Sequence, residues 1–147
     1  MIMTLSVSGK VESLAEVGQW VDDFTSKSSL TASNNFALQL CCEEVVSNIV
    51  KYGSLPQEMA DHQTSTIELS LKAEGHIVEL KVEDSGIAFN PLESTEPGHP
   101  SNLNEAKVGG LGISLIKKFS KNIKYERKNF KNCLFLFFDF SPKPAAS

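Results

Sequence analysis

Glu44 and Asn48 place two polar side chains four positions apart within an otherwise apolar segment. In a helix, residues at this spacing share a face, here beside Leu40 and Cys41. A carboxylate and a carboxamide among apolar neighbours need partners. The amide oxygen of Asn48 suits Mg²⁺, which takes oxygen ligands, and the carboxylate of Glu44 could accept a proton as a general base. The motif alone also fits an exposed polar pair at the rim of a helix.

A second motif, Asp84-Ser85-Gly86, ends a strand-like run. A carboxylate at a strand end can accept a hydrogen bond from an exocyclic amine such as that of adenine. Gly86 would let a planar base approach closely, because it has no side chain. Asp-x-Gly is also common turn chemistry, so a simple turn stays open as the alternative.

A third motif, Gly109-Gly110-Leu111-Gly112, precedes a helix-like run. Free backbone N–H groups and the positive end of the helix dipole favour phosphate at such a position. The stretch lacks the Gly-Lys-Ser/Thr of a P-loop and the strand context of a Rossmann fingerprint. A hinge followed by a helix start is the alternative.

Three amphipathic helices are expected around these motifs. The recurrence of Leu14, Val17, Val21 and Phe24 predicts a helix over 12–26. Thr31, Ser33 and Asn34 offer N-cap oxygens for a helix that runs to about residue 52, where Gly53 and Pro56 would close it. A third helix is expected over 111–120.

The strands are expected to be antiparallel. Alternation predicts a hairpin of 67–72 with 78–83, and a second hairpin of 122–128 with 133–140 around a turn at 129–132. The phenylalanine-rich last strand is expected to be central and buried on both faces, and residues 4–7 are a further strand candidate. The predicted fold is α+β: a two-layer α/β sandwich with a mixed, mostly antiparallel sheet and helices on one face. Residues 1–141 would form a single domain, with 142–147 a flexible tail.

Bulk composition narrows the classes of function. The chain has 147 residues, a net charge of −4 and a pI near 5.4, which argues against direct nucleic-acid binding as the main function. No run approaches the roughly 18 apolar residues that span a bilayer, and residues 1–10 show no signal-peptide pattern. Three cysteines without a paired spacing fit a reducing compartment. We therefore expect a cytoplasmic protein with no membrane partner.

In their order and separations, the three motifs resemble the Bergerat ATP-binding fold shared by DNA gyrase, the ninety-kilodalton heat-shock chaperones, histidine kinases and the mismatch-repair protein MutL. Glu44-x-x-x-Asn48 is similar to the N-box, Asp84-x-Gly86 to the first glycine box, and 109–112 to the second. The resemblance covers roughly residues 14–140. The run Asp-x-Gly-x-x-Phe-Asn-Pro over 84–91 resembles the small anti-sigma factor serine/threonine kinases, which also share the chain length and the N-box glutamate.

This resemblance implies a role for each matched position. Asn48 would hold Mg²⁺, Glu44 would be the general base and Asp84 would bind the adenine amine. The other cofactor-binding positions would be Gly86, Phe89, Lys107, Gly109, Gly110, Leu111 and Gly112. Gly86 would pack against the base, Gly110 and Gly112 would cradle phosphate, and 92–108 would form a lid.

The chain departs from the kinase pattern at two places. Lys51 stands where these kinases often carry histidine, and Lys107-Val108 stands where an arginine often precedes the second glycine box. Lysine can still reach a phosphate as a point charge, without the bidentate fork of arginine.

The resemblance implies an ATP-dependent serine/threonine kinase that acts as an anti-sigma factor. Its partners would be a STAS-type anti-anti-sigma protein as phosphate acceptor and a sigma factor, with a homodimer as a further possibility. The alternative is a non-catalytic switch in which ATP orders the lid and the lid gates a protein partner, or a protein-binding domain that has lost nucleotide. A sensor histidine kinase fits poorly, because His62, His76 and His99 fall in predicted loops or turns.

Overall fold

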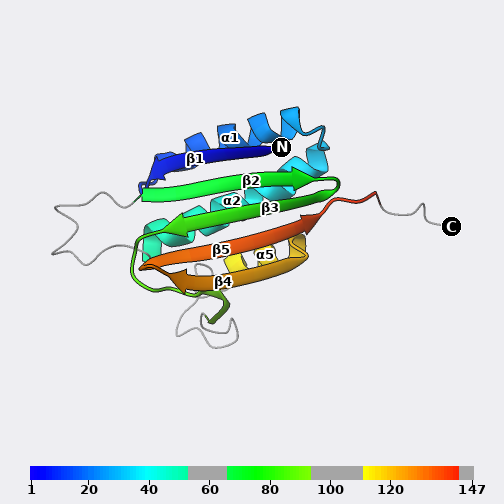
Figure 1. Ribbon diagram of the computed structural model, residues 1–147. Helices are drawn as coiled ribbons and strands as arrows, with labels where there is room; N and C mark the ends of the chain where they lie inside the picture. Colours follow the sequence, from blue (N-terminus) through cyan, green and yellow to red (C-terminus); the bar gives the residue numbers. More distant parts are fainter. Residues whose placement is uncertain (53–65, 94–110, 143–147) are drawn as a thin grey trace.

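Five strands form one sheet in the computed structural model, which describes residues 1–52, 66–93 and 111–142 (Figure 1). The order across the sheet is β1-β2-β3-β5-β4, and all four pairings between these strands are antiparallel. The α+β prediction is confirmed, and the described strands include no parallel pair. Their bounds are β1 (Ile2–Ser8), β2 (Thr66–Glu74), β3 (Ile77–Asp84), β4 (Asn122–Lys128) and β5 (Lys131–Asp139).

The inner face of the sheet is apolar because alternate side chains of each strand point toward the helices. The cross-strand partners Leu71, Leu80 and Leu136 are fully buried there. The outer face carries charged pairs, such as Lys81 with Glu83 at 2.7 Å. One face is therefore core and the other faces solvent.

The prediction that the last strand is buried on both faces is wrong, although β5 lies inside the sheet, between β3 and β4. β5 is the fourth of the five strands, and β3 lies in the centre. Phe138 is fully buried on the inner face, whereas Phe135 and Phe137 on the outer face are only half-buried because the helices cover a single face. The ammonium groups of Lys81 and Lys124 lie 5.7 and 5.6 Å from the Phe135 ring, so cationic side chains shield it from water.

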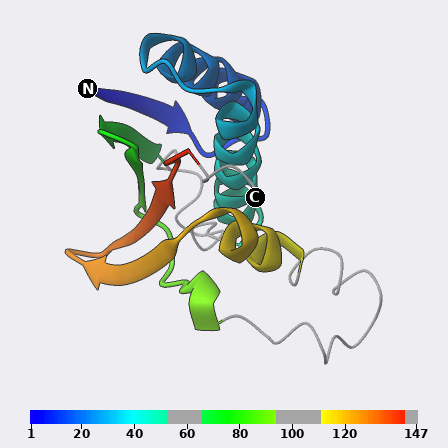
Figure 2. The ribbon, with the colours of Figure 1, turned by 90° about the vertical axis from the view of Figure 1, so that its right-hand side faces the viewer.

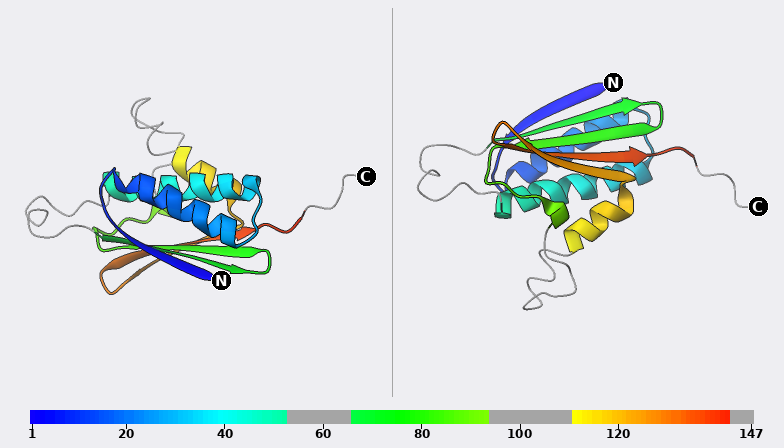
Figure 3. Two further views of the ribbon diagram at one scale, coloured as in Figure 1. Left: turned by 90° about the horizontal axis from the view of Figure 1, so that it is seen from above. Right: turned by 60° about the horizontal axis from the view of Figure 1, so that its bottom comes forward.

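The helices form a second layer over the inner face (Figure 2). They are α1 (Ser13–Lys27), α2 (Ala32–Tyr52) and α5 (Leu111–Phe119), and a short 3₁₀ turn, η1, covers Pro91–Glu93. α1 and α2 lie across the sheet, and α5 lies beside them near β4 (Figure 3). The two long helices agree with the predicted spans to within about a turn, and α5 matches the third.

Polar contacts cap the start of α2 and join it to α1. Thr31 Oγ1 accepts a hydrogen bond from the Asn34 N–H at 3.0 Å, and Asn34 Oδ1 accepts one from the Thr31 N–H at 3.2 Å, a reciprocal cap. Further along, Gln39 Nε2 donates to the Gly18 carbonyl and to Asp22 Oδ1 of α1, both at 2.9 Å. These contacts hold α2, which carries Glu44 and Asn48, against α1.

Several predicted features fall outside the described residues. They are the loop at 56–65 with the helix-closing Gly53 and Pro56, most of the 92–108 segment, the glycines at 109 and 110, and the tail from 143 onward. Within the helices that the structure describes, none is long and apolar enough to cross a membrane.

The turn between β4 and β5 is tighter than predicted. It consists of Asn129 and Phe130, with φ of 54° and 61°, and β5 already begins at Lys131. Two consecutive positive φ angles define a type I′ turn, in which Asn-Gly is favoured. Phe130 occupies the glycine position and is 86% exposed. Its side chain therefore makes few packing contacts that could offset the strain of its left-handed backbone.

Phe130→Gly is therefore expected to stabilise the protein. Relief of the left-handed strain, less the extra backbone entropy of glycine, is worth about 1 kcal/mol, or a Tm rise of about 3 °C. Thermal unfolding followed by circular dichroism measures the shift. Phe130→Ala is the control, since it removes the ring but keeps a Cβ at positive φ. An equal rise in both variants would show that the exposed ring, not the backbone, is the source of the cost.

Candidate functional site

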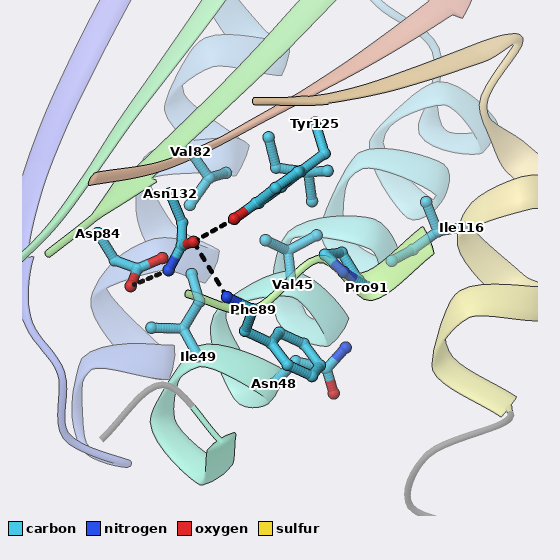
Figure 4. Close-up of a pocket in the computed structure, with 11 residues that line it drawn as sticks. Val45, Asn48, Ile49, Val82, Asp84, Phe89, Pro91, Ile116, Tyr125 and Asn132 are labelled. Carbon is cyan, nitrogen blue, oxygen red and sulfur yellow. Dashed lines mark hydrogen bonds between the residues drawn. The ribbon is translucent and has the colours of Figure 1, made fainter. Parts of the chain in front are cut away.

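A pocket opens between α2, α5 and the ends of three neighbouring strands (Figure 4). The space in it that is open to the centre of a water-sized sphere is about 30 Å³, and all the atom-free space, open solvent included, is about 440 Å³. Most of the lining is apolar, and the polar groups gather at the end where β3 finishes. The lining residues are Val45, Asn48, Ile49, Val82, Asp84, Phe89, Pro91, Ile116, Tyr125, Asn132 and Leu134.

Asp84 is the buried acid of this pocket, with 4% of its surface exposed. Its Oδ1 accepts hydrogen bonds from the Gly86 N–H at 2.9 Å and from Asn132 Nδ2 at 3.1 Å. In the part of the chain that the structure describes, Oδ2 has no hydrogen-bond partner. The pocket thus contains a fixed carboxylate with one oxygen available as an acceptor.

Asn132 holds this end of the pocket together. Its Nδ2 donates to Asp84 Oδ1 and, at 2.8 Å, to the Ile87 carbonyl. Its Oδ1 accepts from the Phe89 N–H at 3.1 Å and from the Tyr125 hydroxyl. Both amide hydrogens and both oxygen lone pairs are therefore used, and they fix the orientation of the amide (Figure 4).

Gly86 is held from both sides of its peptide unit. Its N–H donates to Asp84, and its carbonyl accepts from Arg127 Nη1 at 2.9 Å. Arg127 is a cross-strand neighbour of Asn132, which in turn lies opposite Asp84. The segment that follows β3 is thus fastened to the β4–β5 hairpin at Gly86, Ile87 and Phe89.

Burial controls the titration of the two acidic groups at this end. It raises the pKa of the Asp84 carboxyl above its ordinary value, although the hydrogen bonds from Asn132 and Gly86 and the charge of Arg127 act in the opposite direction. Burial likewise raises the pKa of the Tyr125 hydroxyl, so this group remains a hydrogen-bond donor at neutral pH.

The helical residues of the site lie on successive turns of α2. Asn48 lines the pocket with Val45 and Ile49, whereas Glu44 is half-buried one turn earlier and is not part of the lining. Glu44 lies close enough to Cys41 to act with burial in raising the pKa of that thiol to about 12. Cys41 is therefore a neutral packing residue, and the carboxylate of Glu44 lies at the margin of the pocket.

The structure brings together three of the predicted site residues: Asn48, Asp84 and Phe89 all line the pocket. Gly86 anchors Asp84 without lining the pocket itself. The predicted phosphate contacts are not tested. Lys107, Gly109 and Gly110 lie outside the described residues, and for Leu111 and Gly112 only the helical backbone of α5 is described.

Sequence reasoning missed Asn132, Tyr125 and Arg127. Asn132 falls in the predicted turn at 129–132, and Tyr125 and Arg127 fall in the predicted strand of 122–128 with no role assigned to them. The available signal was alternation: Asn132 has the same parity as Leu134 and Leu136, so a polar side chain had to lie on the apolar face. A buried carboxamide on that face requires partners, and the hairpin and Asp84 supply them.

Comparisons with known proteins agree with this arrangement. A family model described as a histidine kinase-like ATPase domain matches residues 7–138. The serine/threonine-protein kinase BtrW of Bordetella bronchiseptica is 28% identical over 133 residues, which cover 90% of each chain.

Solved structures show the same fold at low sequence identity. The histidine kinase domain of the blue-light activated histidine kinase EL346 from Erythrobacter litoralis aligns with a TM-score of 0.54 and 12% identity. The structure described as the EL346 histidine kinase itself aligns with a TM-score of 0.54 and 10% identity. Each alignment covers 87% of this chain, which spans 61% of the first structure and 41% of the second.

The raised pKa of Asp84 lets us predict how the stability of the protein depends on pH. Because this pKa is higher in the folded protein than in the unfolded chain, the folded state binds the proton more tightly. The cost of burying the charge is fully present above the folded pKa and is relieved as the pH falls through it. Asp84→Asn keeps the acceptor oxygen and removes the charge, so its Tm should exceed that of the wild type at pH 7 to 8.

The Tm difference between Asp84→Asn and the wild type should shrink as the pH is lowered through the raised folded-state pKa of Asp84, where the wild-type carboxyl takes up its proton. Thermal unfolding across this pH series measures it. Asp139→Asn is a suitable control, because Asp139 lies at the exposed end of β5 and its pKa is lowered by hydrogen bonds from Ser141. A difference of the same sign and pH dependence in both variants would contradict the assignment to burial of Asp84.

Proposed function

Since this chain belongs to the histidine kinase-like ATPase family, we propose that it is an ATP-dependent protein serine/threonine kinase that acts as an anti-sigma factor. Its proposed substrate is a serine or threonine of a STAS-type anti-anti-sigma protein, and a sigma factor is its proposed regulatory target. The named relative BtrW, described as a serine/threonine-protein kinase, supports the kinase class. The STAS partner, the sigma factor and a homodimer rest on the motif resemblance alone.

The observation that carries nucleotide binding is the fixed carboxylate at the end of an apolar pocket. Oδ2 of Asp84 is available as an acceptor, and Val82, Ile49 and Phe89 supply apolar walls for a planar base. An adenine ring with its amino group at Asp84 satisfies both features. The acceptor oxygen and the apolar walls thus fit the adenine base of ATP.

Asn48 is the described residue suited to Mg²⁺. It lines the same pocket as Asp84 from α2, and its carboxamide oxygen is a ligand type that Mg²⁺ accepts. The described residues contain no group of three His, Cys, Asp or Glu side chains that could hold a metal alone. This fits an ion that is held mainly by nucleotide phosphates and water, with one protein oxygen.

Glu44 is the proposed general base for the acceptor hydroxyl. Bound ATP would supply the phosphoryl group. The carboxylate of Glu44, one turn before Asn48 and outside the base-binding part of the pocket, would take the proton from the attacking serine or threonine hydroxyl. Because Glu44 is half-buried, a protein substrate can reach it from the pocket margin.

A second candidate function is a nucleotide-dependent switch without phosphoryl transfer. It is favoured by one observation: Glu44 does not line the pocket, so nucleotide can bind there without engaging the proposed base. In that case Asp84 and Asn48 would be needed for binding, and Glu44 would have no effect on it.

Asp84→Asn should weaken Mg²⁺·ATP binding although the protein stays folded. An amide at this position can present a donor where the adenine amine needs an acceptor. A lost or mispaired buried hydrogen bond costs about 1–3 kcal/mol, or roughly tenfold to a hundredfold in affinity. Isothermal titration calorimetry with the wild type and the variant measures the change. Unchanged affinity in the folded variant would remove Asp84 from the base contact.

Glu44→Gln separates the kinase from the switch. It keeps the size of the side chain but removes its ability to accept a proton, so phosphoryl transfer should slow by about a hundredfold or more while ATP affinity barely changes. Asn48→Ala should instead lose Mg²⁺-dependent binding and transfer together. The assay is single-turnover transfer of labelled γ-phosphate to a purified STAS-type protein encoded beside this gene.

Glu43→Gln is the matched control, since Glu43 is the exposed neighbour of Glu44 in the same helix. Full transfer activity in Glu44→Gln would reject the base assignment. Tight ATP binding without transfer by the wild type would favour the switch.

A further inference from the structure

We propose that the tip of the β4–β5 hairpin docks the protein that accepts the phosphoryl group, and that this protein offers an apolar recess rimmed by carboxylates. The hairpin tip consists of Lys128, Asn129, Phe130 and Lys131. This inference rests on the proposed kinase function. It assigns a role to residues that do not line the nucleotide pocket.

Phe130 is an unfavourable residue at this turn for two separate reasons. With φ of 61°, its backbone lies in the left-handed region, where a bulky side chain is rare. Its ring is 86% exposed, more than any other large apolar side chain among the described residues. Backbone strain of this kind persists mainly at functional sites, and an exposed aromatic ring on a tight turn is suited to anchor a protein partner.

Two lysines flank this ring and repel each other. Lys128 and Lys131 lie directly opposite in the pairing of β4 with β5, where like charges destabilise a hairpin. Neither forms a salt bridge within the part of the chain that the structure describes. Strained backbone, exposed ring and like-charged pair thus occur together, as expected where function outweighs stability. A partner that covers the ring and supplies carboxylates would compensate for all three.

The hairpin tip lies beside the polar end of the nucleotide pocket. Asn132, which follows the tip on β5, donates a hydrogen bond to Asp84. Arg127, which precedes the tip on β4, donates one to the Gly86 carbonyl. The turn is therefore at the same end of the sheet as the end of β3 (Figure 1). Since bound nucleotide would fill the pocket, a protein acceptor needs a docking surface outside it that fixes its position for transfer.

A protein fits the hairpin tip better than a membrane or a second copy of this chain. A membrane would meet one ring and two lysines, fewer anchors than stable binding needs, and the hollow beside the tip also presents Glu83 and Glu126. In a symmetric dimer through the tip, the lysines of the two copies would face each other. A shaped recess can instead seat the ring and place its carboxylates against the lysines alone.

The test is steady-state transfer of labelled γ-phosphate from saturating ATP to the purified STAS-type protein encoded beside this gene. Phe130→Gly and Phe130→Ala should each raise the KM for this acceptor at least about tenfold, because both remove the anchoring ring. The kcat and the affinity for Mg²⁺·ATP should stay within about twofold of the wild type, since docking acts equally on ground and transition states. Phe130→Tyr keeps the ring and should keep the KM.

Stability and docking should respond differently to these variants. Phe130→Gly is expected to raise the Tm and Phe130→Ala is not, whereas both should weaken docking. A loss of docking in a variant that is more stable than the wild type cannot come from unfolding. Phe36→Ala is the matched control, since it removes another exposed ring, 59% exposed on α2, and should leave the KM unchanged.

Lys128→Glu tests the charged rim. It replaces a like-charged cross-strand pair with an oppositely charged one, so the hairpin should not lose stability. The KM for the acceptor should rise severalfold at low ionic strength, and the rise should shrink at about 0.5 M salt because salt screens exposed charges. Lys10→Glu makes the same change in net charge at an exposed position before α1 and should leave the KM unchanged.

The outcomes separate docking from the proposed function. A wild type that binds ATP but transfers no phosphate to the acceptor overturns both. Transfer by the wild type with an unchanged KM in the Phe130 variants overturns docking alone, as does an equal rise in Phe36→Ala or a fall in ATP affinity without a change in KM. Self-association, or binding to phosphatidylserine vesicles, that needs Phe130 while the KM does not would assign the tip to another partner and overturn the acceptor.

Discussion

The hydrogen bond between Asn132 Nδ2 and Asp84 Oδ1 joins residues 48 positions apart in the sequence and fixes the polar end of the pocket. It depends on the antiparallel pairing of β3 with β5, which sets these two residues opposite each other on the inner face. A slip of either strand by one residue would turn its own member of this pair to the outer face and break the contact. The apolar residues that fix this register, including Leu80, Leu136 and Phe138, thus also hold the site in place.

This arrangement has a cost in stability that an apolar residue would not carry. Asp84 and Asn132 interrupt an inner face that is otherwise apolar along β3 and β5, and burial raises the pKa of the Asp84 carboxyl. The hydrogen bonds at Oδ1 compensate part of that cost, while Oδ2 keeps no partner among the described residues. An acidic side chain that is 4% exposed at the end of a pocket is more readily explained by ligand binding than by folding.

Much of the fold could be predicted from the sequence because its apolar residues recur at regular spacings. Alternation located β2 and β3, and the three- and four-residue steps of Val17, Val21 and Phe24 located α1. The position of β5 within the sheet was not predictable, because strand order depends on which edges meet in three dimensions. The abundance of phenylalanine was mistaken for burial on both faces, whereas cationic side chains shield Phe135 on the outer face.

The residues of the candidate site also fall into those that the sequence predicted and those that it did not. Motif spacing found Asn48, Asp84 and Phe89, which the structure brings to one pocket. It did not find Asn132 or Tyr125, because their importance comes from pairing across strands rather than from any local pattern. The predicted turn was two residues too long and included Asn132, which was enough to hide the residue that organises the pocket.

The central claim is that the pocket containing Asp84 and Asn132 binds the nucleotide. Titration of the ¹⁵N-labelled protein with Mg²⁺·ATP, followed by two-dimensional NMR, tests it most directly. The account predicts shifts at the Gly86 and Phe89 amides and at the Asn132 side-chain amide, with little change on the outer face around Lys72 and Glu79. Shifts confined to the outer face, or no shifts at millimolar nucleotide, would contradict it.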